Sequence, residues 1–175
     1  FSFNSPHGAC PKCNGLGTIK KVDESLAFNP NLSISEGGIL PWARLIDGGS
    51  WSWRVLEQVC SDEKIPLDVE ISKLTLESRN ILLYGSQSTY HVKGPNRFGK
   101  IVSWDTSFEG VVKSLENRHV QTESDFIRLE IEKFMRIYVC DDCGGSRLKK
   151  ESLSTTIDKK SINDVVSLSI DKFMD

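Results

Sequence analysis

Two cysteine pairs, separated by most of the chain, constrain the fold more than any other feature of the sequence. Each has the spacing Cys-x-x-Cys, at Cys10 and Cys13 and again at Cys140 and Cys143. A glycine two residues after each pair lets the backbone turn tightly, so that N–H groups point toward the sulfurs. Four sulfurs at about 2.3 Å form the tetrahedron that Zn²⁺ prefers. The pattern predicts one closed, structural zinc site.

Other chemistries use the same residues and stay open at this point. Two redox Cys-x-x-Cys sites would each need a strand-to-helix context, which neither pair has. Disulfides suit a secreted chain, and no secretion signal is visible. An iron–sulfur cluster also takes four cysteines. The fifth cysteine, Cys60, lies in an apolar helical pattern, and we expect it to be a buried small hydrophobe.

The distance between the pairs predicts the domain organisation. Ordinary zinc modules separate their pairs by about 12–20 residues, whereas 126 residues lie between Cys13 and Cys140. We therefore expect a domain-sized insertion whose two ends return to one metal. Residues 1–17 hold the first zinc knuckle, 18–136 the insertion, 137–153 the second knuckle, and 154–175 a segment that continues beyond it.

Hydrophobic periodicity predicts an α+β fold, in which mixed helices and a small antiparallel sheet or hairpin are inserted into the four-cysteine zinc module. An apolar stripe predicts a helix over 51–63, and Thr75 and Gly85 suit the ends of a second helix. Helices are also expected over 108–118 and 124–136, the latter running straight into the second knuckle. Strands are expected over 88–93 and 100–105, as a hairpin with a long tip. A short strand near Thr155–Ile157 and a helix after Ser161 complete the prediction.

The charge distribution points to one candidate nucleic-acid contact. The net charge is −2, which argues against a wholly basic binder but not against a local basic patch. No acidic residue occurs from Gly85 to Trp104. The hairpin tip is therefore expected to contact DNA phosphates, with Tyr90 or Phe98 stacking on an unpaired base. The candidate contacts, beside His91, are Lys93, Arg97 and Lys100, extended by Lys113, Arg118 and Arg128 on the adjacent helices; a plain solvated turn is the alternative.

No catalytic or membrane-spanning pattern is recognisable in the sequence. It shows neither a phosphate-cradling glycine loop nor a Ser/His/Asp constellation, so we do not expect an enzyme. The tryptophans are expected mainly as core anchors. No apolar run is long enough to cross a bilayer, and no signal peptide is recognisable. Because the chain opens on Phe1 and leads directly into a motif, we expect it to be part of a longer protein.

Three stretches together resemble the UvrA family, whose members are damage-recognition ATPases of bacterial nucleotide excision repair. They are residues 1–17 (FSFNSPHGACPKCNGLG), 108–118 (FEGVVKSLENR) and 140–153 (CDDCGGSRLKKESL). The resemblance implies an insertion domain carried by the zinc module of the first signature domain. It also implies a cytoplasmic, dimeric parent protein of ABC type that works with UvrB.

The resemblance sets limits on what these residues do themselves. The ATP and Mg²⁺ sites and the UvrB-binding region of such a parent lie outside them, and DNA contact by the insertion would be weak, backbone-directed and sequence-independent. Two alternatives remain open. One is a purely structural zinc strut, and the other is a DnaJ-like zinc module that binds peptides, suggested by the Cys-x-x-Cys-x-Gly-x-Gly pattern of residues 10–17.

Overall fold

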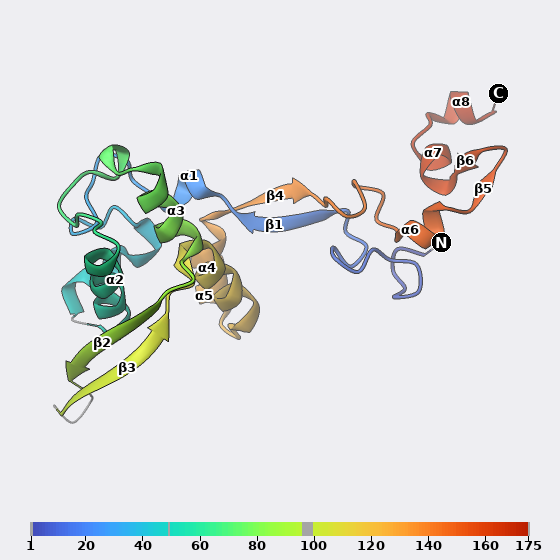
Figure 1. Cartoon of the computed structure of the whole chain (residues 1–175). Coiled ribbons are helices and arrows are strands. Elements are labelled where there is room, and N and C mark those ends of the chain that lie inside the picture. The colour runs from blue at the N-terminus through green and yellow to red at the C-terminus, as the bar shows by residue number, and fades with distance from the viewer. Residues whose placement is uncertain (1, 49, 96–99, 175) are drawn as a thin grey trace. The chain divides into compact units, whose positions relative to one another are not determined.

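The computed structural model describes residues 2–48, 50–95 and 100–174. The chain forms two compact units (Figure 1). Unit 1 comprises Phe1–Lys21 together with Ile137–Asp175, and unit 2 comprises Val22–Arg136. The helices and small antiparallel sheets confirm the predicted α+β class. None of the helices in the described ranges combines the length and apolar character that a membrane span requires.

Most of the helical structure belongs to unit 2. Its helices are α1 (Glu24–Ala27), α2 (Trp51–Asp62), α3 (Leu76–Tyr84), α4 (Gly110–Gln121) and α5 (Asp125–Glu132), with 3-10 segments η1 (Leu40–Gly48) and η2 (Ile71–Lys73). The Ser50 hydroxyl accepts a hydrogen bond from the Trp53 N–H at 3.2 Å and caps α2. Thr75 caps α3 through the Ser78 N–H at 3.1 Å, and Gly85 ends that helix with φ +82°. Both predicted helices are confirmed.

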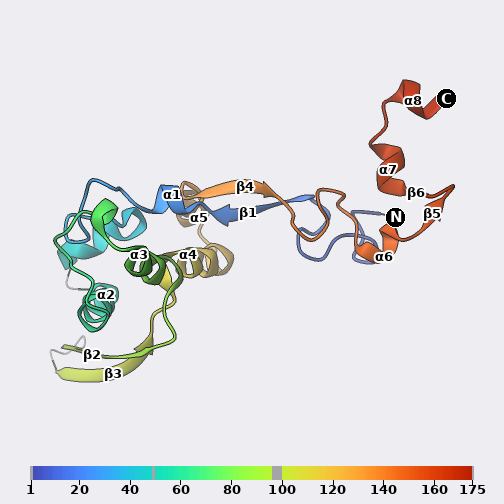
Figure 2. The same cartoon turned by 45° about the horizontal axis from the view of Figure 1, so that its top comes forward.

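A hairpin of β2 (Thr89–Pro95) and β3 (Ile101–Ser107) packs against α2 (Figure 2). The strands are antiparallel, as predicted, and each extends two residues beyond its expected end. Tyr90, Val92 and Gly94 are buried, whereas His91 and Lys93 between them are exposed. This alternation is typical of a strand with one face on a core.

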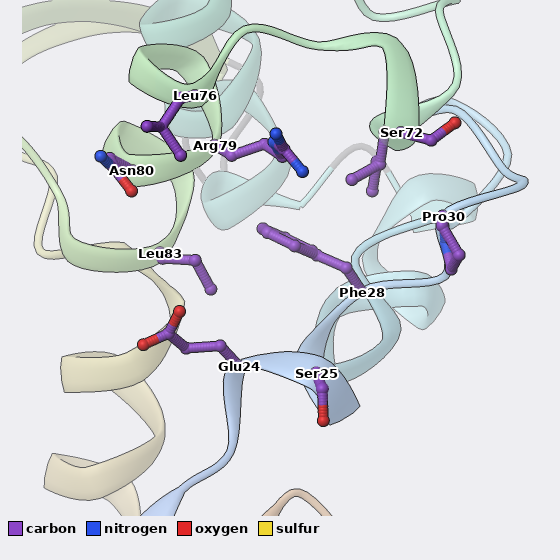
Figure 3. A pocket seen from close by; sticks show the side chains of 10 residues that line it. Glu24, Ser25, Phe28, Pro30, Ser72, Leu76, Arg79, Asn80 and Leu83 are labelled. Atoms are coloured by element: carbon purple, nitrogen blue, oxygen red, sulfur yellow. The ribbon is translucent and has the colours of Figure 1, made fainter.

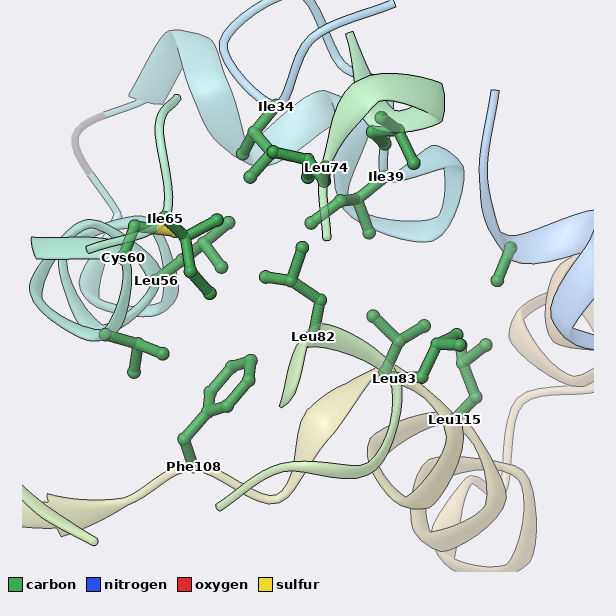
Figure 4. Close-up of a cluster of buried hydrophobic side chains, with 14 of the residues drawn as sticks. Ile34, Ile39, Leu56, Cys60, Ile65, Leu74, Leu82, Leu83, Phe108 and Leu115 are labelled. Carbon is green, nitrogen blue, oxygen red and sulfur yellow. The ribbon is translucent and has the colours of Figure 1, made fainter. Parts of the chain in front are cut away.

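The core of unit 2 joins its helices (Figure 4). On α2, Leu56 is 2% exposed and Cys60 1% exposed, and they pack in one cluster with Leu82 from α3 and Leu115 from α4. The stripe predicted from the sequence is therefore the buried face of α2. Burial raises the pKa of the Cys60 thiol to about 12, which keeps it neutral near pH 7. Cys60 is a small hydrophobe, as predicted.

The predicted helix over 124–136 is too long. Helix α5 ends at Glu132, and β4 (Met135–Val139) begins three residues later. The apolar spacing continues to Phe134, but the Phe134 carbonyl accepts a hydrogen bond from the Asp23 N–H at 2.8 Å. Arg136 also forms an ion pair with Asp23 at 2.6 Å. These long-range partners favour an extended chain over a further helical turn.

Unit 1 is made of short elements. Strand β1 (Thr18–Val22) pairs with β4, and β5 (Thr156–Ile157) pairs with β6 (Lys160–Ser161). Short helices α6 (Lys150–Leu153), α7 (Ile162–Val166) and α8 (Ile170–Met174) follow the second cysteine pair. Ser161 and Asp164 form a reciprocal capping box, which begins α7 where the sequence predicts a helix.

Candidate metal centre and candidate nucleic-acid interface

The four paired cysteines converge in unit 1. All four Sγ atoms lie within 4.8 Å of one another, and all four side chains are buried. Cys10 and Cys140 have their sulfurs 3.9 Å apart, and Cys13 and Cys143 3.7 Å apart. An ion with tetrahedral sulfur ligands at about 2.3 Å places them about 3.8 Å apart. The four thiols can therefore hold one metal ion, and their spacing is too long for disulfides, whose S–S distance is about 2.05 Å.

Backbone hydrogen bonds join the two knuckles reciprocally. The Cys10 N–H donates to the Arg147 carbonyl, and the Cys140 N–H donates to the Gly17 carbonyl, each at 2.9 Å. The Gly17 N–H points at the Cys13 sulfur, 3.2 Å away, as the glycine pattern predicts. Gly15 has φ +79°, and a Cβ there would lie 1.9 Å from the Phe3 carbonyl oxygen. Only glycine fits this position of the first knuckle.

The surroundings of the cluster shift the pKa values of two of its thiols in opposite directions. Burial raises the pKa of the Cys10 thiol to about 12. Burial also acts to raise the pKa of Cys13, but hydrogen bonds from the Gly17 N–H and from neighbouring thiols outweigh it and lower that pKa to about 7. Cys13 is therefore the first of these two thiols to ionise as pH rises.

Lysines of unit 1 lie beside the second knuckle. Lys12 forms an ion pair with Asp141 at 2.7 Å, and Lys21 approaches the same carboxylate at 3.4 Å. The hydrogen bond from Lys12 lowers the pKa of Asp141. Lys150 pairs with Asp142 at 3.4 Å. The three lysines exceed the two aspartates they pair with by one positive charge. This excess partly offsets the negative charge that the four thiols acquire when they ionise.

The basic residues predicted to contact DNA lie on two parts of unit 2. Lys93 is exposed on β2 and Lys100 is exposed immediately before β3, whereas Arg97 and Phe98 lie outside the described residues. Lys113 and Arg118 are exposed on α4. The end of the hairpin points away from α4 and α5 in both views (Figures 1 and 2). The structure therefore does not bring the two groups into one patch.

Local hydrogen bonds occupy two of the residues that the sequence predicts as DNA contacts. Arg128 donates hydrogen bonds to the Thr122 carbonyl at 2.7 Å and to Asp125 at 3.2 Å. Its guanidinium is therefore bound to groups at the N-terminal end of α5. The expectation that Tyr90 stacks on a base is wrong. Tyr90 is 1% exposed and donates a hydrogen bond to Glu63 at 2.6 Å. Residue 90 lies on the buried face of β2. A shift of one residue in strand register would have placed it on the exposed face.

One basic residue near the hairpin was not found from the sequence. Arg54 of α2 donates a hydrogen bond from Nη1 to the Pro95 carbonyl at 3.3 Å. Its side chain crosses Gly94, where a Cβ would lie 2.5 Å from Nη1. The two partners are 41 residues apart, so only the three-dimensional packing reveals the contact. Arg54 adds positive charge next to Lys93 and Lys100.

A cavity of unit 2 is lined by residues other than these basic ones (Figure 3). It has a volume of about 390 Å³ and is bordered by Glu24, Phe28, Arg79 and Leu83. The Arg79 Nε is buried and has no hydrogen-bond partner among the described residues. The Tyr84 hydroxyl donates to Glu24, and this hydrogen bond, with burial, raises the pKa of Tyr84 to about 12.

Comparison with known proteins places the chain in a family. The family described as UvrA DNA-binding domain matches residues 23–133. The chain is 40% identical over 173 residues to UvrABC system protein A of Methanothermobacter thermautotrophicus, and 39% identical over 172 residues to that of Bacillus subtilis. Each alignment covers 97% of this chain and 18% of the relative, so the chain spans less than a fifth of these relatives' length.

A solved structure shows the same fold. The crystal structure of UvrA2 from Deinococcus radiodurans superposes with a TM-score of 0.72, at 23% sequence identity, over 99% of this chain and 22% of that one. At this identity the likeness supports the α+β architecture. The family match over residues 23–133, which is more than half of the chain, identifies the protein as a member of the UvrA DNA-binding domain family.

Proposed function

We propose that this chain is the zinc-stabilised, DNA-contacting insertion region of a UvrA protein that acts in nucleotide excision repair. The observation that carries the proposal is the convergence of Cys10, Cys13, Cys140 and Cys143 at the two ends of a unit whose family is described as DNA-binding. In this proposal, residues 18–136 form the insertion, and the two knuckles hold it at its base. The region engages DNA for a larger protein and catalyses nothing itself.

Zinc is the metal that the donor set fits best. Four buried sulfurs with near-tetrahedral spacing leave no position for a water or substrate, which is the arrangement of structural zinc sites. Bound zinc would supply a cross-link between the residues that enter and leave the insertion. The protein's own contribution is the pair of reciprocal knuckle hydrogen bonds, which holds the sulfurs in place.

Metal analysis of the purified chain tests this part of the proposal. About one zinc per chain is expected, and Cys140→Ser should lower the zinc content and the thermal stability together. Cys60→Ala removes a thiol outside the cluster and is the matched control, so it should leave the zinc content unchanged. Two metals per chain, or no metal in protein purified with zinc, would contradict the assignment.

The DNA contact is proposed for the hairpin end of unit 2. Residues 22–136 contain 13 Lys and Arg against 17 Asp and Glu, so any attraction to phosphates has to be local. Lys93, Lys100 and Arg54 supply positive charge at one end of the hairpin, and Arg97 falls between the first two in sequence. Such a contact would be weak, backbone-directed and independent of sequence.

Titration of duplex DNA at low and at high salt tests the contact. Each neutralised phosphate contributes about −0.9 to the slope of log affinity against log salt, so three contacts give about −2.7. The triple reversal Lys93→Glu, Arg97→Glu and Lys100→Glu should abolish the low-salt binding. A control with the same change of net charge is Lys64→Glu, Lys73→Glu and Lys133→Glu, which should bind only slightly more weakly. Equal binding by both variants would favour a purely structural strut.

The proposal extends to the role of the parent protein. ATP and Mg²⁺ binding, dimerisation and partnership with UvrB are assigned to regions outside these 175 residues, in a cytoplasmic complex. The 175-residue chain should accordingly show no saturable ATP binding and no ATP hydrolysis above background. Micromolar ATP affinity of the purified chain would contradict the assignment of ATP binding to other regions.

A further inference from the structure

A small aromatic pocket lies beside the hairpin, between the start of α2, the end of β3 and the start of α4. It has a volume of about 270 Å³. Trp42, Val55 and Phe108 provide apolar lining, and Ser52 and Ser114 add hydroxyl groups. The volume lies near the lower end of small-molecule sites, which run from about 300 to 1,000 Å³. That size suits a single heterocycle better than a peptide.

One exposed tryptophan lines this pocket, and a second, on the hairpin, packs against the first. Trp51, which lines the pocket, is 39% exposed, and Trp104 of β3 is 43% exposed. Their rings meet edge to face, with centroids 4.7 Å apart and planes at 76°. Trp42 and Trp53, in contrast, pack against the core, as the sequence predicts. The rings of Trp51 and Trp104 therefore form a contiguous aromatic surface next to the pocket.

Positive charge flanks the tryptophan pair. Arg54 lies three residues after Trp51 on α2, and its guanidinium reaches the Pro95 carbonyl at 3.3 Å. On α4, Lys113 is exposed and is the sequence neighbour of the pocket residue Ser114. Aromatic rings between cationic side chains are the combination by which proteins hold single-stranded nucleic acid, with bases on the rings and phosphates on the cations.

We infer that this pocket receives an unstacked nucleobase, either unpaired or displaced from a distorted duplex. Trp51 lines the pocket and offers the stacking surface, and Trp104 packs edge to face against Trp51 from the hairpin. Ser52, Ser114 and Glu109 also line the pocket and would offer hydrogen-bonding groups to the edge of the base. The Glu109 carboxylate also accepts a hydrogen bond from Asn117 at 2.9 Å. The inference rests on the proposed DNA contact and deepens it: the hairpin end binds phosphates of any DNA, and the pocket favours DNA with an unstacked base.

The test compares a duplex that carries a short unpaired bulge with the fully paired duplex of the same sequence. The zinc-loaded chain should bind the bulged duplex more tightly. Trp51→Ala should lower affinity for the bulged duplex about tenfold, because stacking of one base on one aromatic ring has that order of effect. Trp104→Ala removes the ring that packs on Trp51 and should lower this affinity as well. Affinity for the paired duplex should stay unchanged. Phe126→Ala removes an aromatic ring that is 70% exposed on α5 and should bind both probes like wild type.

A second variant blocks the pocket and leaves the tryptophans in place. Ser52→Leu, at an exposed helical position, should remove the preference for the bulged duplex and the quenching of tryptophan fluorescence that accompanies binding. If Trp51→Ala and Ser52→Leu both retain the wild-type preference, the inference is overturned while the proposed DNA contact stands. If wild-type chain binds neither duplex at low salt, the proposed function fails and the inference with it.

Discussion

His91 and Asp105 face each other across the β2–β3 hairpin, with His91 Nδ1 2.7 Å from Asp105 Oδ1. Both side chains are exposed, on the same outer face as Lys93. The sequence stretch free of acidic residues ends at Trp104, yet the antiparallel register returns the next residue, Asp105, beside the basic strand. A carboxylate therefore lies next to the surface that we propose for phosphate contact.

Replacing this carboxylate should strengthen DNA binding. Asp105→Asn removes one negative charge from the face that carries Lys93, and a charge interaction of about 1 kcal/mol in water corresponds to roughly a fivefold change at most. We expect a two- to fivefold gain in low-salt affinity for duplex DNA, measured by fluorescence anisotropy. Asp62→Asn, at the end of α2, is the control and should have a smaller effect. A loss of affinity in Asp105→Asn would place the DNA contact elsewhere.

Substitution of a knuckle glycine should weaken zinc binding most where the added Cβ clashes with the backbone. Gly15→Ala puts a Cβ 1.9 Å from the Phe3 carbonyl oxygen at φ +79°, so the knuckle has to distort. Gly144→Ala also meets a positive φ, +58°, but no atom of the described structure lies within 4 Å of its Cβ. It should carry only the left-handed backbone cost of about 1–2 kcal/mol. Zinc affinity, measured by chelator competition, should fall much further for Gly15→Ala; equal losses would contradict the clash.

Tyr90 should be a stability residue without a role in DNA binding. Its hydroxyl lies 2.6 Å from Glu63 and 2.5 Å from Ser86. Tyr90→Phe leaves those groups without this partner, which should lower the free energy of unfolding by about 1–2 kcal/mol in chemical denaturation. Affinity for DNA with unpaired bases should not change. A loss of that affinity at unchanged stability would restore Tyr90 as a stacking residue.

Ionisation of the Cys60 thiol should make the free energy of unfolding fall as the pH rises in the alkaline range. The folded pKa of this thiol is raised to about 12 from an ordinary value of 9.0, so the unfolded chain releases the thiol proton first. The stabilisation is complete below pH 9 and is lost as the pH rises toward 12. The difference in unfolding free energy between wild type and Cys60→Ala, measured with zinc present, should therefore shrink over that range. A difference that stays constant with pH would show that the Cys60 thiol does not stay protonated in the fold.

The features predicted correctly from the sequence are those with local signals. Thr75 and Gly85 mark the ends of α3 by capping chemistry alone, and the stripe through Leu56 and Cys60 marks the buried face of α2. The convergence of the cysteines follows from the two knuckles, because neither pair has ligands enough for an ion by itself.

The features that were missed depend on partners far along the chain. Asp23 draws residues 134–136 out of the helix that their apolar spacing suggests. The packing of the hairpin on α2 determines two further features. It brings Arg54 to the Pro95 carbonyl, and it leaves Trp104 exposed although a core position was expected. Local periodicity contains no information about either arrangement.

The reciprocal hydrogen bonds between the knuckles have a mechanical consequence. Residues 10–17 are bound to residues 140–147 before the chain enters unit 2 and after it leaves. Tension applied to the two sides of this junction would therefore pass directly from one knuckle to the other, and the backbone of unit 2 would carry none of it while the junction holds. A pull on the two ends of unit 1 would therefore leave the core that supports the hairpin folded.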